Sequence, residues 1–476
     1  MNTIQRIVKN VGVLVLGNIV QKILTLVLFI YIARFLGSVG FGQYTFIISF
    51  VGMFGIITGF GLDNLMQRDV ARDKAKTNKY LSNVSFMRII LFPNALILII
   101  ISINLLNYPK NIINLVYLYS IYLLLSSIAY GFRNIFLAHE KMEYEFIIVV
   151  LNRAIVVLLS IVTLYLGYGV FGLLAALIAG EFFSLIFSFL IIVKKIAIPK
   201  FGIDLEFCKD LIQRAFPFIF LSVFVTIYYN IDTVMLSKMQ GDEATGLYNS
   251  AARLLSALLI IPYAFIGSIF PTMSRFYVES KDRLKLAHTH ALRYLLIVSL
   301  PMALGTFLLA DRIIVRVYGG EFSEAAIALQ ILVWATAFKF LNSALFTVLL
   351  SINKEKTNTK IMVSGIILNV LLNLVLIPKF SYAGASFATV VAEALFFILS
   401  FYVVSQSLHR LPIHKLAFKP AIATLAMAAF ILYFREIITL FIIIPLAAVL
   451  YFAALFVLTE FSEEDFKLMR KAIKRE

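Results

Sequence analysis

The sequence has little charge and almost no cysteine, so salt-bridge-rich and disulfide-stabilised folds are both poor descriptions of it. Of its 476 residues, 14% are charged and 61% are hydrophobic, and the mean hydropathy is +0.95. No water-soluble core of this size needs such an excess of apolar residues, so we interpret the chain as a polytopic membrane protein. Its one cysteine, Cys208, excludes an intramolecular disulfide and a cysteine-rich metal site. Stability must therefore come from helices that pack in lipid.

Signatures of catalysis are also missing. The sequence has no glycine-rich phosphate loop of the Walker type, which argues against nucleotide hydrolysis by this chain. His288 and His290 lie two residues apart but have no clear carboxylate or cysteine partner for zinc. The turns predicted on the outer side are only a few residues long, too short for a catalytic domain. We expect no catalytic residue, no metal site and no enzymatic activity.

Long apolar segments are what the sequence does contain. Polar turns divide it into about fourteen segments of about twenty residues, the length of a helix that crosses ~30 Å of hydrocarbon. The first segment is too long for a secretory signal and has no small-residue cleavage site, so we interpret it as a membrane span. We predict an all-α fold with spans at residues 11–33, 41–62, 89–107, 112–135, 146–167, 170–193, 215–237, 247–271, 294–317, 324–350, 360–379, 382–407, 419–435 and 438–459.

The basic residues test these spans independently, because cytoplasmic loops are enriched in Lys and Arg. With the N-terminus inside, 32 of the 42 basic residues fall in cytoplasmic segments or the adjoining helix ends, and seven fall in outer turns. We therefore predict that both termini are cytoplasmic. The same split explains the net charge of +16 without nucleic acid as a partner. Three basic residues remain inside spans: Lys22, Arg253 and Lys339.

An internal repeat relates the two halves of the chain. Gly42 in Phe41-Gly42-Gln43-Tyr44 matches Gly246 in Thr245-Gly246-Leu247-Tyr248, a displacement of 204 residues. Glu181 and Glu393 each follow a glycine by nine residues and are displaced by 212. Two copies with six helices each have the same orientation, so we predict two bundles related by a pseudo-twofold axis along the membrane normal. Substrate sites in such folds lie between the halves.

Two amphipathic segments and a helical hairpin lie outside the repeat. Between the halves, Asp204 is a candidate helix cap, and Leu205, Cys208, Leu211 and Ile212 fall on one face. Near the end of the chain, residues 461–475 have an apolar face opposite a basic one, so we expect both segments on the inner membrane surface. The predicted divisions are 1–193, an N-terminal bundle; 194–214, a cytoplasmic linker; 215–407, a C-terminal bundle; 408–459, an appended transmembrane hairpin; and 460–476, a basic cytoplasmic tail.

Two lysines lie near the middle of their spans, where a charge is costly. Lys22 is in the first span and Lys339 in the tenth, too deep for either to reach water easily. One interpretation is a cationic cavity for an anionic head group such as a phosphate or pyrophosphate. The other is an interhelical ion pair, for example with Glu181 or Glu393.

The seventh and eighth spans carry a second group of charges. Asp232 and Arg253 lie at similar depths below the outer ends of these spans, so they are candidates for an ion pair. The functional alternative is that Arg253 binds substrate phosphate while Asp232 positions it or binds a coupling cation. Arg34, at the outer end of the first span, either adds a positive group to this site or anchors to head groups.

The two glutamates need a different interpretation because they occupy equivalent positions in the repeat. A feature present in both copies favours a shared role in packing, whereas Lys22, Asp232, Arg253 and Lys339 have no charged counterpart at the matching position. Glu181, Glu393 and Asp232 are candidates for coupling to H⁺ or Na⁺. We expect no cofactor.

Nine short motifs follow one another along the chain. They are Ala33-Arg34-Phe35-Leu36-Gly37, Phe41-Gly42-Gln43-Tyr44, Phe60-Gly61-Leu62, Arg68-Asp69-Val70-Ala71, Ile231-Asp232-Thr233-Val234-Met235-Leu236, Gly246-Leu247-Tyr248-Asn249-Ser250-Ala251-Ala252, Phe270-Pro271, Leu376-Ile377-Pro378 and Gly384-Ala385. In their order, and with the fourteen predicted spans, they resemble the polysaccharide and oligosaccharide flippases of the multidrug/oligosaccharidyl-lipid/polysaccharide exporter superfamily. The resemblance covers essentially the whole chain.

The resemblance implies alternating-access transport of a lipid-linked oligosaccharide on a polyprenyl phosphate or pyrophosphate. Transport runs from the cytoplasmic to the outer leaflet of the cell membrane of a bacterium or archaeon, for synthesis of a cell-surface glycan. Membrane lipids and a polysaccharide polymerase or glycosyltransferases are the partners that this role implies. Two alternatives stay open: a cation-coupled multidrug or small-molecule exporter of the same fold, and a membrane enzyme or scaffold of polysaccharide assembly. Lone cations in the spans disfavour cationic drugs as cargo.

Overall fold

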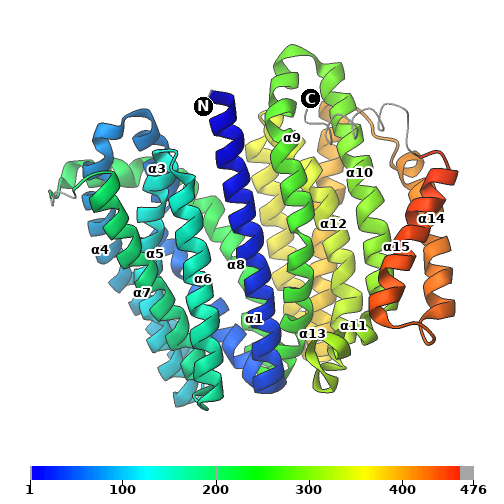
Figure 1. Ribbon diagram of the computed structural model, residues 1–476, viewed down its shortest axis with the longest axis horizontal. Coiled ribbons are helices and arrows are strands. Elements are labelled where there is room, and N and C mark those ends of the chain that lie inside the picture. Colours follow the sequence, from blue (N-terminus) through cyan, green and yellow to red (C-terminus); the bar gives the residue numbers. More distant parts are fainter. Residues whose placement is uncertain (1–2, 199–201, 461–476) are drawn as a thin grey trace. The chain divides into compact units, whose positions relative to one another are not determined.

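The protein is built from α-helices joined by short turns (Figure 1). The computed structural model describes residues 3–198 and 202–460, and this part of the chain contains no β-strand. The elements are α1 (Thr3–Met53), α2 (Gly55–Gly59), α3 (Leu62–Arg72), η1 (Lys74–Lys76), α4 (Thr77–Leu105), α5 (Lys110–Ala138), α6 (Met142–Tyr165), α7 (Gly169–Lys195), α8 (Leu205–Leu258), α9 (Ile260–Glu279), α10 (Lys281–Leu308), α11 (Ala310–Tyr318), η2 (Gly320–Phe322), α12 (Ala325–Ser351), α13 (Glu355–Ser407), α14 (Ile413–Phe434) and α15 (Leu440–Val457).

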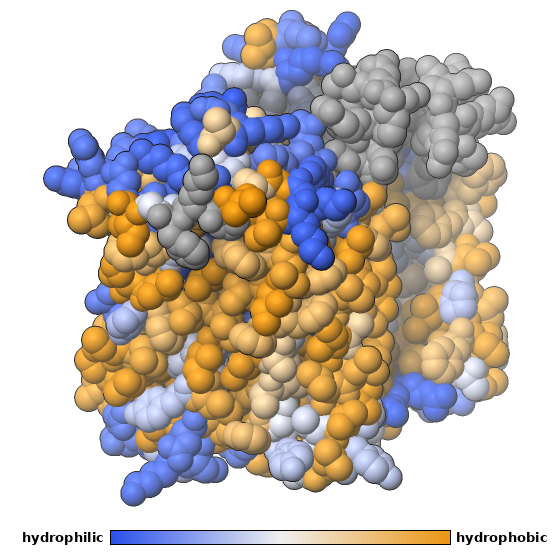
Figure 2. All heavy atoms as spheres, turned by 60° about the vertical axis from the view of Figure 1, so that its left-hand side comes forward, coloured by the Kyte–Doolittle hydropathy of each residue, from blue (hydrophilic) through white to orange (hydrophobic). Residues whose placement is uncertain are grey.

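The described residues contain eleven helical segments that are long and apolar enough to cross a membrane. Three of them, Leu16–Gly59, Ser222–Glu279 and Glu355–Ser407, are 44, 58 and 53 residues long, about twice what a bilayer needs. Each contains a break in the helical backbone, at Gly37, Gly241 or Ser381. Each is therefore a pair of spans, and the described chain has the fourteen spans expected from sequence. On the face shown in Figure 2, hydrophobic side chains form a broad band, and hydrophilic side chains gather beyond its edges.

The internal repeat is visible in the backbone. Gly37 has φ 69° and ψ −176°, and its counterpart in the second copy, Gly241, has φ 83° and ψ −172°. Gly169 and its counterpart Ser381 have φ of 53° and 49°. These values lie in the left-handed region, which glycine adopts most readily and other residues rarely. The first pair has the same displacement as the glycine motifs of the sequence, and the second pair has that of the two glutamates, so the same turns recur in both halves.

The chain forms two compact units: the first is Met1–Ser250 and the second is Ala251–Glu476. The first unit contains α1–α7 and most of α8, and the second contains the end of α8 and α9–α15. This division falls just after the turn at Gly241, whereas the sequence places the halves of the repeat on either side of residues 194–214. Contact-based units and sequence repeats measure different properties, so the predicted domain limits stay predictions.

A buried arginine ties three helices of the first unit together. Arg88 on α4 is 1% exposed and forms a 2.5 Å ion pair with Asp63 on α3. It also donates to the carbonyl oxygen of Ser127 on α5, and Asn134 on α5 donates to the same Asp63 carboxylate at 2.9 Å. A Cβ at Gly131 would clash with the Arg88 guanidinium, so this glycine makes room for the buried charge. Arg88 is one of the 32 basic residues that the sequence assigns to cytoplasmic segments or adjoining helix ends, and that assignment did not predict its buried role.

The segment between the halves is bound to the first unit. Asp204 caps α8 by accepting a hydrogen bond from the Phe207 amide at 2.9 Å, as the sequence predicts. Cys208 and Leu211 are buried in a core formed with α3, α4, α5 and α7, whereas Leu205 and Ile212 are 71% and 39% exposed. Two of the four residues assigned to one apolar face therefore pack inside the protein. The second amphipathic segment, 461–475, lies outside the described residues.

The last two spans pack against α10 in the second unit. Tyr451 on α15 donates a 2.7 Å hydrogen bond to the carbonyl oxygen of Ile297 on α10. Glu460, just after α15, forms ion pairs of 3.4 Å with Arg293 on α10 and 4.0 Å with Lys419 on α14. The opposite face of the hairpin exposes large apolar side chains such as Val449. The appended hairpin therefore has one face on the second unit and one suited to lipid.

The ninth span is shorter than the sequence suggests. Its helix, α10, ends at Leu308, and α11 follows as a separate helix rather than as the end of a span reaching residue 317. Ala310, Ile314 and Tyr318 recur at helical spacing and are buried, while Asp311 and Arg316 are exposed. With η2, this connection occupies residues 309–324, so it is longer than the few residues expected for an outer turn. The boundary between α10 and α11 was not predicted because the buried face of α11 continues the apolar pattern of α10.

Candidate functional site

A polar cavity, open at the surface, lies between α1, α5 and α6 of the first unit. Its volume is about 350 Å³, within the range of small-molecule sites. Gly17, Asn18 and Gln21 of α1 form one wall. Tyr130, Arg133 and Leu137 of α5 and Glu145, Phe146 and Val149 of α6 form the others.

Arg133 and Glu145 give the cavity one charge of each sign. Their Nε and Oε1 atoms lie 3.8 Å apart, and the two side chains are only 15% and 14% exposed. Among the described residues, neither Arg133 Nε nor Glu145 Oε2 has a hydrogen-bond partner, although both atoms are buried. A buried polar atom without a partner costs free energy, so a polar ligand in this cavity would gain hydrogen bonds to these two atoms.

A second polar cluster lies on α5, α6 and α7 of the same unit. Glu181 is 8% exposed, and its Oε1 accepts long hydrogen bonds of 3.5 Å from Tyr122 Oη and Asn152 Nδ2. Asn152 also donates to the carbonyl oxygen of Gly180 at 2.8 Å. Arg153 and Arg133 both contribute to the electrostatic environment of Tyr122, and Glu181 contributes to that of Glu145. The charged groups of the two clusters are therefore near enough to act on each other electrostatically.

The sequence did not single out Arg133 or Arg153. The positive-inside count assigned both to the cytoplasmic segment between two spans or to its helix ends. The structure places Arg133 on α5, five residues before the helix ends at Ala138, and Arg153 on α6, eleven residues after it begins at Met142. The signal was available in the spacing, because both are more than a helical turn from the turn at residues 139–141.

The predicted residues of α1 lie beside the polar cavity rather than in it. Lys22 and Arg34 are both exposed at the surface of the first unit. Lys22 directly follows Gln21, which lines the cavity, and Arg34 precedes the Gly37 break by three residues. The structure thus separates these cations along the helix by twelve residues, about 18 Å at the helical rise.

Asp232 is fixed by the other arm of its own hairpin. It is 7% exposed, and its Oδ2 accepts a 2.7 Å hydrogen bond from Tyr248 Oη. The next residue, Thr233, donates to Asn249 Oδ1 at 3.2 Å. These bonds join the two arms of α8 on either side of Gly241, so Asp232 has a structural role whatever else it binds.

The hairpins of the two repeats meet within the first unit. A Cβ added to Gly42 would clash with the carbonyl oxygen of Asp242, and one added to Gly246 would clash with that of Ser38. Gln43 Nε2 donates to Asp242 Oδ2 at 2.9 Å across the same contact. Only glycine allows two backbones to approach so closely, which explains why both copies of the motif carry it.

In the second unit, Lys339 forms the ion pair that was one of its two interpretations. Its Nζ lies 3.8 Å from Glu393 Oε1. Asn342, one turn further along α12, donates to the other oxygen, Oε2, at 2.8 Å and to the Glu393 carbonyl oxygen at 3.1 Å. Arg253 lies near Tyr318 of α11: burial raises the pKa of Tyr318, and the Arg253 guanidinium opposes that rise.

A charge cluster outside the spans holds the segment before α8. Asp69 on α3 accepts hydrogen bonds from Tyr80 Oη at 2.6 Å, from Arg68 Nε at 2.9 Å and from Arg214. Burial alone would raise the pKa of Asp69, but these three donors outweigh it and lower the pKa to about 2. Asp69 is therefore ionised at any physiological pH. Metal binding has no comparable support, because the described residues contain no group of three His, Cys, Asp or Glu side chains that could hold an ion.

Comparison with solved structures places this arrangement in a known fold. The inward closed conformation of the lipid II flippase MurJ aligns with a TM-score of 0.78 and 17% sequence identity, covering 94% of this chain and 98% of that one. At this identity the likeness shows the fold, which is the two-bundle fold predicted from sequence.

Comparison with known sequences points the same way. The chain is 24% identical over 406 residues to an uncharacterized membrane protein of Methanocaldococcus jannaschii, covering 79% of each chain. It is 25% identical over 189 residues to the probable flippase AglR of Haloferax volcanii, covering 39% of this chain and 40% of that protein. The MatE family model matches residues 217–375. The model described as "Polysaccharide biosynthesis protein" matches residues 7–277, more than half of the chain. The chain therefore belongs to the polysaccharide biosynthesis protein family.

Proposed function

We propose that this protein is a flippase for a lipid-linked oligosaccharide. The carrier is a polyprenyl phosphate or pyrophosphate, and transport runs from the cytoplasmic to the outer leaflet of the cell membrane, with both termini cytoplasmic. Family membership and the flippase names of two similar proteins support the class of transport. Anionic head groups need a cationic, water-accessible path through apolar spans, because a lone charge in hydrocarbon is costly.

The observation that carries the proposal is the polar cavity of the first unit. Arg133 offers a guanidinium whose Nε has no hydrogen-bond partner among the described residues, in a space of about 350 Å³. Arginine binds phosphate through parallel hydrogen bonds, and Asn18, Gln21 and Tyr130 add neutral donors suited to a glycan. We propose that the head group enters here while the lipid tail stays in the bilayer.

The residues singled out from sequence keep their proposed roles. Lys22, Arg34, Asp232, Arg253 and Lys339 are proposed to bind substrate, with Lys339 shared between substrate and Glu393. Glu181, Glu393 and Asp232 are proposed to couple transport to H⁺ or Na⁺, and a polysaccharide polymerase or glycosyltransferases are proposed partners.

A flipping assay tests the cavity directly. Purified protein in proteoliposomes is given a labelled lipid-pyrophosphate oligosaccharide, and an added enzyme attacks only the substrate that has reached the opposite leaflet. We expect Arg133→Ala to slow flipping by about 10- to 100-fold, the effect of losing one or two hydrogen bonds between charged groups. Arg275→Ala is the matched control, because this arginine is 63% exposed and pairs only within its own helix. Normal flipping by a folded Arg133→Ala protein would remove the cavity from the proposal.

Alternating access makes a second prediction, at the contact between the two hairpins. The side chains of Gln43 and Asp242 meet in a 2.9 Å hydrogen bond, so cysteines at both positions, in a Cys208→Ser background, are within reach of a short cleavable crosslinker for thiols. We expect crosslinking to stop flipping and cleavage of the linker to restore it, because outward opening must part these hairpins. Unchanged transport with the crosslink formed would show that the hairpins stay together throughout the cycle. Proton- or sodium-driven efflux of a cationic dye without glycan-lipid flipping would instead favour the exporter.

A further inference from the structure

A second cavity of the first unit is also open at the surface, and its lining is mainly apolar. Its volume is about 360 Å³. Helices α4, α5 and α7 each supply a pair of lining side chains: Phe86 and Ile89, Ile128 and Phe132, and Phe189 and Ile192. Ile89 and Phe189 are 54% and 38% exposed, so the cavity is open at the surface that we assign to lipid.

The cavity is amphipathic along the helix axes. On α4 the lining residues Ser82, Phe86 and Ile89 follow Lys79 at helical spacing, so the lysine stands one turn beyond the apolar stripe. On α7, Lys195 stands one turn beyond Ile192 in the same way, and it is exposed. Two positive side chains thus mark the polar end of a cavity whose walls are hydrocarbon and aromatic.

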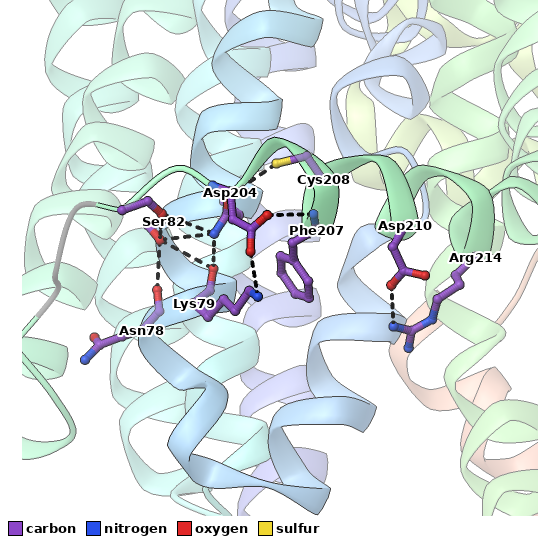
Figure 3. A network of polar contacts seen from close by, with 10 residues as sticks. Asn78, Lys79, Ser82, Asp204, Phe207, Cys208, Asp210 and Arg214 are labelled. Atoms are coloured by element: carbon purple, nitrogen blue, oxygen red, sulfur yellow. Dashed lines mark hydrogen bonds and ion pairs between the residues drawn. The ribbon is translucent and has the colours of Figure 1, made fainter.

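The same end is closed by the segment before α8. Gly202 and Ile203 line the cavity there, and the Gly202 carbonyl oxygen accepts hydrogen bonds of 3.0 Å from Ser82 Oγ and 3.3 Å from Asn83 Nδ2. Figure 3 shows Lys79 directed at Asp204, at 2.7 Å, beside the ring of Phe207. The wall is therefore held by specific bonds and is part of the folded unit.

We propose that this cavity binds one hydrocarbon chain of an anionic glycerophospholipid, with the phosphate beside Lys195 and the hydroxyl group of Ser85. Ser85 lines the cavity at this end, whereas the Ser82 hydroxyl already donates to the Gly202 carbonyl oxygen. Lys79 is already neutralised by Asp204, which leaves Lys195 to set the preference for negative charge. The bound lipid fills the space beneath Ile203 and so stabilises the docked position of the segment that joins the two halves of the repeat.

The position of the cavity favours a phospholipid over the substrate's own isoprenoid tail. The apolar cavity shares no lining residue with the polar one around Arg133. Its polar end coincides with helix termini, where α7 ends at Lys195 and α4 begins at Thr77, which is head-group depth for a resident lipid. Hydrogen bonds from Ser82 and Asn83 hold Gly202 in the wall of this cavity. A wall held in this way suits a lipid that stays bound better than a tail that enters and leaves in each transport cycle.

Native mass spectrometry of the full-length protein tests the proposal. Delipidated protein is titrated with phosphatidylglycerol, phosphatidylcholine or undecaprenyl phosphate. We expect one saturable phosphatidylglycerol, bound about tenfold more tightly than phosphatidylcholine. Ser85→Trp fills the cavity and should abolish this site. Leu158→Trp, at a position that is 63% exposed on α6 and lines neither cavity, should retain it.

A charge-reversal variant keeps the test decisive if Ser85→Trp fails to fold. Lys195→Glu lies at an exposed helix end and should fold, yet lose the preference for phosphatidylglycerol over phosphatidylcholine. Equal retention of phosphatidylglycerol by Lys195→Glu and by the unmodified protein would overturn the proposal. So would displacement of phosphatidylglycerol by an equimolar amount of undecaprenyl phosphate, which would assign the cavity to the isoprenoid. Because these measurements use no transport, they stand apart from the flipping assay.

Discussion

Glu181 and Glu393 occupy the same place in the two copies of the repeat but are held in different ways. Glu393 pairs with Lys339 at 3.8 Å and accepts a 2.8 Å hydrogen bond from Asn342, both on α12. In the described part of the chain, Glu181 accepts two long hydrogen bonds of 3.5 Å, from Tyr122 and Asn152 on two different helices. The second unit therefore neutralises its carboxylate with a cation, and the first holds its carboxylate by weak hydrogen bonds.

The neighbouring residue shows the same contrast in packing. Gly180, before Glu181, corresponds to Ala392, before Glu393. A Cβ at Gly180 would collide with Val156 of α6, whereas Ala392 is fully buried without such a conflict. The first unit uses the missing methyl group to bring α6 and α7 close enough for Asn152 to reach the Gly180 carbonyl oxygen. The two copies therefore share the acidic residue but differ in the groups around it.

Removing the cation of the second unit should have the largest effect. Lys339→Met leaves the buried Glu393 carboxylate without its ion pair, and we expect a loss of about 3 kcal/mol in the free energy of unfolding. Equilibrium unfolding in detergent measures it. The double variant Lys339→Met, Glu393→Gln should recover most of the loss, because no uncompensated charge remains. A double variant as unstable as the single one would show that Lys339 acts through packing rather than through its charge.

Adding the missing methyl group to the first unit should have the next largest effect. We expect Gly180→Ala to cost about 2 kcal/mol, because the new methyl group overpacks against Val156 and moves Asn152 away from the Gly180 carbonyl oxygen. The matched change in the other copy, Ala392→Gly, should cost about 1 kcal/mol through helix propensity. Thermal unfolding of both variants measures the difference. Equal effects in the two copies would mean that the close approach of α6 and α7 is dispensable.

The smallest effect concerns one carboxylate in each unit that forms ion pairs with basic residues. Asp69 pairs with Arg214 in the first unit, and Glu460 pairs with Arg293 and Lys419 in the second. The pKa of Asp69 is lowered to about 2, so its contribution is complete above its unfolded-state value near 4 and is lost as the pH falls towards 2. We expect about 1 to 2 kcal/mol of local stability to disappear in that window.

Hydrogen exchange of residues 205–215 at pH 5 and pH 3 measures this loss. At pH 5, the Asp69→Asn protein should already show the weak protection from exchange that the unmodified protein shows at pH 3. Asp73→Asn is the control, because the carboxylate of Asp73 is 47% exposed. Unchanged protection of Asp69→Asn at both pH values would show that the buried Cys208 and Leu211 hold the segment without help from the ion pair.

The sequence was sufficient for the fold because its signals were local. Fourteen spans follow from the lengths of apolar runs, and the register of the repeat follows from glycine motifs whose backbone geometry recurs at Gly37 and Gly241. The boundary of α10 at Leu308 was missed because α11 continues the apolar pattern with one buried face. Leu205 and Ile212 were grouped with Cys208 because helical spacing alone does not show which neighbours are present to pack against.

The site was less accessible to sequence because it depends on pairings between distant residues. Lys339 and Glu393 lie on different helices, α12 and α13, so their ion pair was one of two open interpretations. Arg133 and Arg153 were assigned by their nearness to a cytoplasmic turn. Their spacing shows that they lie more than a helical turn inside their helices, but it does not show which groups they face. The sequence ranked mid-span charges highest, whereas the described polar cavity uses charges nearer the helix ends.

The contact between the two hairpins has the reciprocity of a homodimer interface. Gly42 abuts the carbonyl oxygen of Asp242, and Gly246 abuts that of Ser38. Ser38 and Asp242 are themselves equivalent positions of the repeat, so each copy presents the same two positions and receives the same two in return. Such an interface is isologous, the kind that a twofold axis generates between identical subunits. A chain of half this length could make the same contact with a second copy of itself, so the geometry that joins the repeats is one that an ancestor could have used before its gene was duplicated.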